Sequence, residues 1–363
     1  MNTSNRPTCP TAPNEPGSSI GLPPTLAMSL TTYTPGAPVP PGPRMNPWRR
    51  SGATPVSAEG RIEDLLCALW HMGDRHLRDD GSVTDIARRP IPSAGATYAV
   101  HTHLIVGTDG TDGLEPGHYV YDHDRGQLLR RDSARETAAG WELPHRPFID
   151  SRVVFSVQPG RSFGRYRHRA WPLWIADAAY ALEAVRFLLD TDLPGVFGPG
   201  PEIRAQLGMP PAAETDAWLR RGMVPEIPLV SIGLSSSWAV APQRRHALAR
   251  RRSPKLVDFV RNPVHNTNAA RLAELTGQAW IAHADRIETW EVAPRAPAET
   301  IYDSLWHAHS AAARLCYNAA LSQKVRCRPV SGIPAAAESW TMHAVAMLDG
   351  IEDTEEEPDD DRP

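Results

Sequence analysis

The feature that most constrains the fold is a long apolar segment, residues 173–189, which carries hydrophobic side chains around nearly its whole circumference. It is rich in alanine and leucine and contains no glycine or proline. A helix that is hydrophobic on all sides must be buried, because no face of it suits water. We therefore expect this helix to lie at the centre of the molecule, with other elements packed around it.

The segments on either side of this helix alternate between helical and extended patterns. Apolar residues recur at helical spacing over residues 57–72, where Ser57 is the predicted N-cap. Short apolar runs bounded by turn residues predict strands. These strands are residues 98–106, 118–121, 127–130, 153–157 and 227–234, and further helices are expected at 267–277 and 299–321. Such alternation predicts an α+β or α/β core.

Composition divides the chain into four parts. Residues 1–45 are rich in proline, threonine, serine and glycine and are expected to be disordered. Residues 46–240 carry the helix and strand patterns, and residues 241–348 are interpreted as a C-terminal extension or second subdomain. Residues 349–363 form an acidic tail, which is more typical of a solvated segment than of a docking peptide.

Charge and cysteine content exclude several classes of protein. The net charge of −4 gives no basic footprint for nucleic acid, and no segment approaches the length of an apolar membrane span. The four cysteines are far apart and form neither a disulfide framework nor a CxxC metal site. The first residues lack the pattern of a secretion signal. We expect a reducing, cytoplasmic environment.

Three stretches could carry chemistry, and each also has an ordinary structural interpretation. The first is Arg49, Arg50 and Ser51, because guanidinium and hydroxyl groups bind phosphate, although a solvated basic surface explains them as well. The second consists of small residues that would let the backbone approach a flat ligand, or that simply form a turn into a strand. Its residues are Pro92, Ser93, Ala94, Gly95 and Ala96.

The third stretch is a cluster of cationic and phenolic groups just before the long helix. It contains Arg165, Tyr166, Arg167, His168 and Arg169. Such donors suit an anion, or an electron-rich ring that must accept negative charge, but a charged helix entrance is an equally good interpretation.

In this order, the stretches resemble one family, the nitroreductase-like flavoproteins, and within it the SagB-type azoline dehydrogenases of thiazole/oxazole-modified peptide and thiopeptide biosynthesis. That branch typically reads Arg-Arg-Ser-x-Arg, Pro-Ser-Ala-Gly-Ala-x-Tyr-Pro, Gly-Leu-x-Pro-Gly-x-Tyr-x-Tyr-Asp and Lys-Tyr-x-x-Arg. The long third motif is matched by residues 113–122, and Asp177 matches an aspartate common in the helix. The resemblance covers about residues 46–235.

The resemblance implies a nitroreductase-like α+β fold with a central, mostly antiparallel sheet and a bound FMN at a homodimer interface. Arg49, Arg50 and Ser51 would hold the phosphate and ribityl chain, while residues 92–96 would lie against the isoalloxazine ring. The implied reaction is oxidation of peptide thiazolines or oxazolines to thiazoles or oxazoles for antibiotic biosynthesis, within a possible cyclodehydratase complex. The alternatives are a general FMN nitroreductase that uses NAD(P)H, or a degenerate scaffold of a peptide-modifying complex.

Departures from the family motifs affect the predicted catalytic residues. Arg165 stands where the family has lysine, and an arginine cannot act as a general base because it stays protonated. Tyr166 is then the predicted base or proton donor, with its pKa lowered by the neighbouring arginines. Ala99 replaces a proline, and Ser235-Ser236 stands where a phosphate-binding arginine is common.

Two weaker signals complete the sequence. His101 and His103 alternate along one predicted strand and could bind a metal, but no third ligand is evident, so ordinary polar strand residues are favoured. Residues 251–253 repeat the Arg-Arg-Ser pattern, and a later alanine-rich helix resembles the central one. The C-terminal region is thus a candidate degenerate second copy of the fold, although the small-residue motif is not repeated.

Overall fold

The computed structural model describes most of the chain between Trp48 and Gly350. The described residues are 48, 52–77, 82–131, 148–166, 170–198, 201–209, 226–330, 333–334 and 338–350. The tail expected at residues 1–45 and nearly all of the acidic tail lie outside them.

A seven-stranded sheet forms the N-terminal unit, in the order β1-β6-β5-β4-β7-β9-β8, and every neighbouring pair of strands is antiparallel. The strands are β1 Thr54–Val56, β4 Val100–Val106, β5 Gly117–Asp122, β6 Gln127–Arg130, β7 Arg152–Val157, β8 Gly195–Phe197 and β9 Ile227–Gly233. All five predicted strands are present. β8 is a further strand that the sequence did not predict, because three residues are too few for a pattern and only pairing with β9 makes them a strand.

Two predicted element starts are wrong. Helix α2 spans Gly60–Trp70, and Ser57 is not its N-cap: Glu59 holds that position without a side-chain capping bond. The reason is that β1 pairs with β6 as far as Val56, which keeps the chain extended there. Strand β4 likewise begins at Val100, so Tyr98 belongs to the loop before it.

Helix α5, Ala170–Leu189, is the predicted central helix, and all but three of its residues are buried. It shares the main core with α2 on one face of the sheet, reached through Val100, Leu104 and Phe155. A smaller apolar cluster covers the opposite face with Trp48 and α6, Pro201–Gln206. Because both faces are covered, all seven residues of β4 are buried.

The C-terminal unit is a three-stranded antiparallel sheet in the order β10-β12-β11, accompanied by helices. Its elements are α8 Pro242–Arg250, α9 Leu256–Arg261, α10 Thr267–Thr276, β10 Arg286–Val292, α11 Ala298–Ser322, β11 Val325–Val330 and β12 Trp340–Asp349. The sequence led us to expect only helices here, so this sheet is a correction. Arg328 is part of β11, since this segment pairs along β12.

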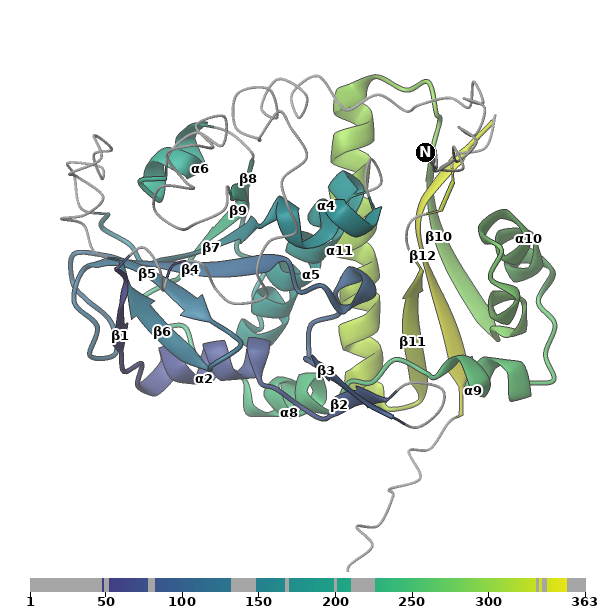
Figure 1. Cartoon of the computed structure of the whole chain (residues 1–363), viewed down its shortest axis with the longest axis horizontal. Helices are drawn as coiled ribbons and strands as arrows, with labels where there is room; N and C mark the ends of the chain where they lie inside the picture. The colour runs from purple at the N-terminus through teal and green to yellow at the C-terminus, as the bar shows by residue number, and fades with distance from the viewer. Residues whose placement is uncertain are drawn as a thin grey trace, which may run out of the picture.

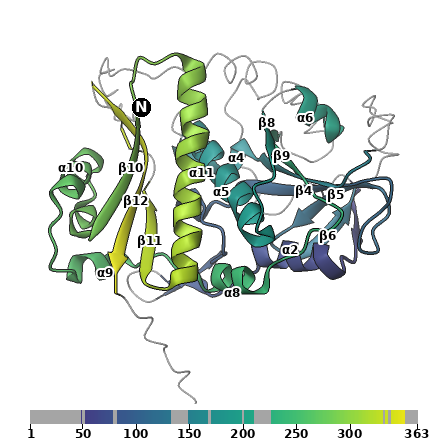
Figure 2. The same ribbon diagram turned by 180° about the vertical axis from the view of Figure 1, so that it is seen from behind.

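Helices α5 and α11 join the two units at the middle of the molecule, between the large sheet and the small one (Figures 1 and 2). Tyr317 Oη donates a hydrogen bond to the backbone oxygen of Tyr180, 2.9 Å away, across this contact. Ala308 and Ala312 of α11 are fully buried in the same core cluster as α5. The two units therefore share one continuous hydrophobic core.

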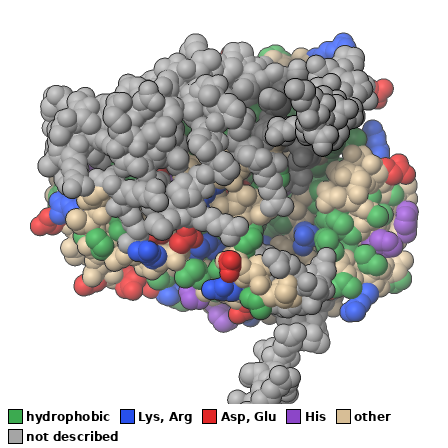
Figure 3. All heavy atoms as spheres, viewed as in Figure 1, with side chains coloured by type: hydrophobic (Ala, Val, Ile, Leu, Met, Phe, Trp, Pro, Cys, Tyr) green, Lys and Arg blue, Asp and Glu red, His purple; other side chains and the backbone are tan. Residues whose placement is uncertain are grey.

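The surface shows no concentration of one charge on the described part of the face in Figure 3, where acidic, basic and apolar side chains are interspersed. A short hairpin of β2 (Arg75–Leu77) and β3 (Val83–Ala87) lies below the meeting point of the units in Figure 1. In the parts of the chain that the structure describes, no helix combines the length and apolar character needed to cross a membrane.

Candidate functional site

The loop before β4 has a strained backbone. Gly95, Ala96 and Tyr98 have φ values of 57°, 52° and 45°, all in the left-handed region. Glycine adopts this region freely, but each of the other two residues there costs on the order of 1–3 kcal/mol. Such strain persists only where surrounding contacts impose it, and it is concentrated at functional sites.

Asp177 of helix α5 imposes this conformation. Its Oδ2 accepts a hydrogen bond from Ser93 Oγ at 2.8 Å, and its Oδ1 accepts one from the backbone N–H of Ala94 at 3.0 Å. Ser93 Oγ in turn accepts a bond from the N–H of Tyr98 at 2.9 Å. This explains a carboxylate in an otherwise apolar helix: it ties the loop to the core.

Burial raises the pKa of Asp177 to about 7, although the hydrogen bonds from Ala94 and Ser93 act in the opposite direction. Two donors are too few to compensate for removing a carboxylate from water. The side chain can therefore hold or release a proton near neutral pH, which is unusual for an aspartate and typical of functional carboxyl groups.

Arg89 supports the loop from the other side. Its guanidinium donates to the backbone oxygens of Trp70 and His123, both at 2.9 Å, and to Asp124 Oδ1 at 2.8 Å. The same group lies 5.1 Å from the centre of the Tyr98 ring. Since these contacts fix the guanidinium, Arg89 holds Tyr98 in place.

A cavity of about 970 Å³ opens between this loop and the C-terminal unit. Its walls come from the β2–β3 region, the loop, one face of α5, the segment that joins α8 to α9, and strands β11 and β12. A volume near 1,000 Å³ is at the upper end for sites that bind cofactors or drug-sized ligands. The cavity is bounded by both units, so neither unit forms it alone.

The charged part of the lining is mainly basic. The described lining contains six basic side chains, Arg88, Arg89, Arg251, Arg252, Lys255 and Arg328, against the two carboxylates Asp74 and Asp177. Several of the guanidiniums are held by backbone oxygens, as in the 2.7 Å bonds from Arg252 to Ala249 and from Arg328 to Pro254. A wall of this composition is suited to an anionic group such as phosphate.

Arg251 connects this wall to the loop segment of the other unit. Its Nε donates to the backbone oxygen of Pro90 at 2.9 Å, and its side chain is almost fully buried. The contact places the Arg-Arg-Ser sequence of residues 251–253 opposite Ser93–Ala96 in space, although about 160 residues separate them in the chain.

The inner end of the cavity holds two neutral polar groups. Tyr180 lies one turn after Asp177 on α5, and its Oη is 3.0 Å from Nε2 of His343 in β12. Burial lowers the pKa of His343 to about 3 and raises that of Tyr180 well above its ordinary value. Both side chains therefore stay uncharged at neutral pH and offer hydrogen bonds rather than charge.

The predicted site residues are placed as follows. Pro92, Ser93, Ala94, Gly95 and Ala96 all line the cavity. Arg49, Arg50 and Ser51 lie outside the described residues, as does the side chain of Arg165.

Tyr166 is the last residue of α4, Pro159–Tyr166, and packs against the main core; the lining of the cavity does not include it. Of the residues that the sequence missed, Arg252 had a signal in the repeated Arg-Arg-Ser pattern. His343 lies within the apolar run of residues 340–348, which is typical of a buried strand and is a signal that could have predicted β12.

A second buried polar cluster lies on the opposite face of the sheet, centred on Glu226. Its carboxylate oxygens lie 2.7 Å from His101 Nδ1 and 2.9 Å from His103 Nε2. They also accept bonds from Ser156 Oγ at 2.6 Å and Trp48 Nε1 at 2.8 Å. Within the described residues, no group of three or more potential ligands could hold a metal ion. The structure thus assigns the two histidines to this carboxylate.

The comparisons with known proteins establish the fold. No protein-family model matches the sequence, and no curated protein matches it. Among solved structures, a candidate nitroreductase from Anabaena variabilis is similar with a TM-score of 0.57 at 12% identity, covering 84% of this chain and 91% of that chain. This chain therefore has a nitroreductase-like fold.

A second structure is similar over a smaller part of the chain. It is the E. coli microcin synthetase McbBCD complex with truncated pro-MccB17 bound, with a TM-score of 0.30 and 17% identity over 66% of this chain and 78% of that one. A similarity at this level supports no conclusion about fold or function.

Proposed function

We propose that this protein is an FMN-dependent oxidoreductase whose cofactor binds in the 970 Å³ cavity. The observation that carries the proposal is the position of the strained loop Ser93–Ala96 opposite a basic wall, within a nitroreductase-like fold. A flavin mononucleotide needs a flat, closely approaching surface for its ring and cationic donors for its phosphate. The loop supplies the flat surface, and the opposite wall of the cavity supplies the cationic donors.

The residues present fit this cofactor. The backbone of Ala94, Gly95 and Ala96 would lie against the ring, since small side chains keep that surface flat. Arg252, Lys255 and Arg328 would hold the phosphate. FMN, when bound, supplies an acceptor for a hydride.

In this proposal, the second Arg-Arg-Ser sequence, residues 251–253, binds the phosphate. This role was expected of Arg49, Arg50 and Ser51. The reason is that Arg252 and Ser253 line the cavity together with the loop. An arginine that binds phosphate directly contributes a charged hydrogen bond of about 1.5–3 kcal/mol.

The substrate class rests on the sequence resemblance: we propose oxidation of a thiazoline or oxazoline in a peptide to the aromatic ring. Aromatisation removes a hydride from one ring carbon and a proton from its neighbour, so a positioned base should accelerate it by about 10²–10⁴-fold. Tyr166 is the candidate base that the sequence motif before the long helix suggests. Asp177 is the candidate from the geometry, because it lines the cavity and its pKa of about 7 suits a base at neutral pH.

Spectra of the purified protein test the cofactor. We expect flavin absorbance that denaturation releases as FMN, and a protein that stays colourless after incubation with FMN would refute the proposal. Arg252→Ala should weaken FMN binding by about ten- to a hundred-fold. Arg50→Ala is the matched variant. If only Arg50→Ala weakens FMN binding, the phosphate is bound by Arg49, Arg50 and Ser51 instead.

Activity measurements then separate the alternatives. An azoline dehydrogenase should reduce its bound flavin when mixed anaerobically with an azoline-containing peptide. Reduction by NAD(P)H without a response to azolines would identify a general nitroreductase. A flavin that neither reagent reduces would identify a non-catalytic scaffold.

A further inference from the structure

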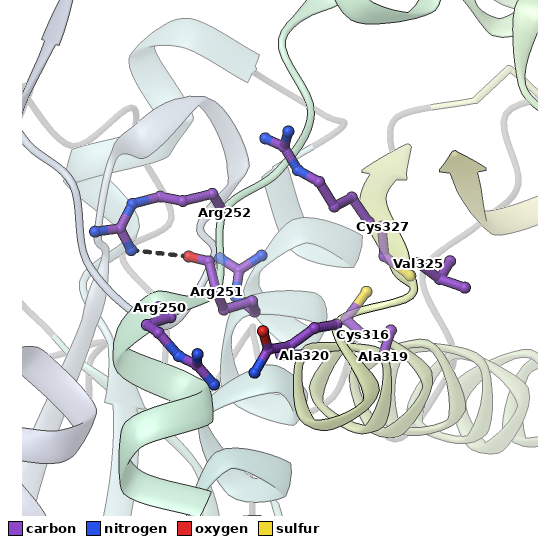
Figure 4. A pocket seen from close by; sticks show the side chains of 10 residues that line it. Arg250, Arg251, Arg252, Cys316, Ala319, Ala320, Val325 and Cys327 are labelled. Carbon is purple, nitrogen blue, oxygen red and sulfur yellow. Dashed lines mark hydrogen bonds between the residues drawn. The ribbon is translucent and has the colours of Figure 1, made fainter. Parts of the chain in front are cut away.

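A smaller cavity of about 50 Å³ contains two cysteines that the proposed function does not use. Cys316 lies in the last part of α11, and Cys327 lies in β11 just after the turn that joins them. Both cysteines line this cavity (Figure 4), and each thiol perturbs the ionisation of the other. Because α11 packs against β11, two thiols that line one small cavity need little movement to form a bond.

The two thiols are not equivalent. The Tyr180 hydroxyl lies 4.0 Å from the Cys316 sulfur, where it can stabilise a thiolate. The neighbouring Cys327 also lowers the pKa of Cys316, while the pKa of Cys327 is raised. Burial acts against the thiolate in both, whereas the nearby Arg251 favours it in both. Cys316 is therefore the nucleophile of the pair, because the thiolate is the reactive form of cysteine.

Arginines surround this pair. Arg250, Arg251 and Arg252 line the same small cavity (Figure 4), and Arg326 also lines it. Positive side chains of this kind are typical of reactive cysteines rather than of inert buried ones. A volume of about 50 Å³ holds a few water-sized molecules, so it admits hydrogen peroxide and excludes a bulky disulfide such as oxidised glutathione.

We propose that Cys316 and Cys327 form an oxidisable dithiol that hydrogen peroxide converts to a disulfide. The Cys316 thiolate attacks one peroxide oxygen, the O–O bond breaks, and the leaving hydroxide takes a proton to become water. The Cys327 sulfur then attacks the resulting sulfenic acid, the S–S bond forms, and the hydroxyl leaves as a second water. The two thiols lose one electron each, and the peroxide gains both.

The proposal does not depend on FMN, because the peroxide can be supplied directly. It also fits the proposed function, since oxygen that accepts two electrons and two protons from a reduced flavin becomes hydrogen peroxide. The dithiol would then lie beside Arg251, which lines both cavities.

Peptide mapping of the native full-length protein after peroxide treatment tests the proposal. We expect the peptides that contain Cys316 and Cys327 to become cross-linked, with the loss of two hydrogens, and a reductant to restore both thiols. Oxidised glutathione should produce neither this disulfide nor a mixed disulfide at these positions. Two free thiols after peroxide, or a disulfide from either one to Cys67, would overturn the proposal.

Variants identify the order of attack without requiring the disulfide. In Cys327→Ser, a sulfenic acid should accumulate at Cys316 and react with dimedone once the peroxide-treated protein is unfolded in its presence, because the small cavity excludes dimedone from the folded protein. Cys316→Ser should leave Cys327 unmodified. Cys67→Ser is the matched control, because Cys67 lies far along the chain on α2, and it should form the disulfide like the wild type. Dimedone labelling of Cys327 instead of Cys316 would reverse the assigned roles and contradict the mechanism.

Discussion

At the scale of single residues, two buried carboxyl groups show how the neighbouring side chains decide the protonation state. Asp177 has two hydrogen-bond donors, and burial raises its pKa to about 7. Burial acts the same way on Glu226, but the two histidines and the bonds they make outweigh it, so its pKa lies well below the ordinary value. Asp177 is thus poised to change charge near neutral pH, and Glu226 stays ionised.

Asp177→Asn should remove a pH dependence from the stability of the protein. Because the pKa of Asp177 is higher in the folded protein, its contribution to stability is complete below about pH 4 and is lost as the pH rises to about 7. Over that range the wild type should lose about 4 kcal/mol of unfolding free energy relative to the variant. Urea denaturation at a series of pH values measures this difference.

The control is Asp192→Asn, which changes an exposed aspartate shortly after the end of the same helix. Its pH profile should follow that of the wild type. Parallel profiles for wild type and Asp177→Asn would show that folding leaves the pKa of Asp177 unchanged, and would contradict its assignment as a group that titrates near neutral pH.

Tyr166→Phe tests the catalytic assignment that comes from the motif. If Tyr166 accepts the substrate proton, the variant should keep its fold and FMN and lose about 10²–10⁴-fold in the rate of flavin reduction by an azoline peptide. Single-turnover absorbance measures that rate. A rate within about threefold of the wild type would remove Tyr166 from the mechanism, and a loss in Asp177→Asn alone would assign the proton to the carboxylate in the cavity.

At the scale of elements, the Glu226 cluster joins three neighbouring strands through one side chain. Glu226 immediately precedes β9, His101 and His103 lie on β4, and Ser156 lies on β7. Trp48, far away in the chain, donates to the same carboxylate. The cluster therefore fixes the register of the central strands on the face opposite α5.

Glu226→Gln should destabilise the protein by about 2–4 kcal/mol, because the amide nitrogen would face donors and the histidines would lose a charged acceptor. Chemical denaturation measures the change. The exposed Glu288→Gln on β10 is the control and should have little effect. Equal stability of the two variants would mean that the histidines, not the carboxylate, hold the strands in register.

At the scale of the whole molecule, the arrangement of the two units bears on how the site is completed. Helices α5 and α11 share one core, and the cavity takes one wall from each unit. The family resemblance implies a homodimer in which each site borrows residues from the partner, and homodimerisation remains a prediction. Within the cavity, the C-terminal unit supplies the second wall, and its interpretation as a degenerate second copy also remains a prediction.

We therefore expect each chain to bind one FMN without help from a second chain. The FMN dissociation constant should stay the same when the protein is diluted, whether light scattering gives the 39.8 kDa of one chain or twice that mass. FMN fluorescence during dilution, with light scattering on the same samples, measures both quantities. Release of FMN in step with dissociation of a dimer would show that the partner contributes to the site.

Local patterns in the sequence were enough to predict much of the N-terminal unit. The apolar segment at residues 173–189 predicted a central helix, because a surface apolar on all sides has to be buried. Alternating and short apolar runs predicted β4, β5, β6, β7 and β9. The small-residue loop Ser93–Ala96 was identified because few residues other than glycine and alanine permit a close backbone approach.

Only the tertiary structure decided which distant residues meet. Strands β8 and β11 have weak patterns of their own, because β8 has three residues and β11 contains Pro329, and both exist through pairing with neighbours. Asp177 was noticed in the helix, but its pKa depends on burial and on two donors from another segment. The basic wall of the cavity required Arg252 and Arg328 to reach the loop from the second unit. Contacts between residues far apart in the chain follow from the packing of a shared core, and no local pattern specifies them.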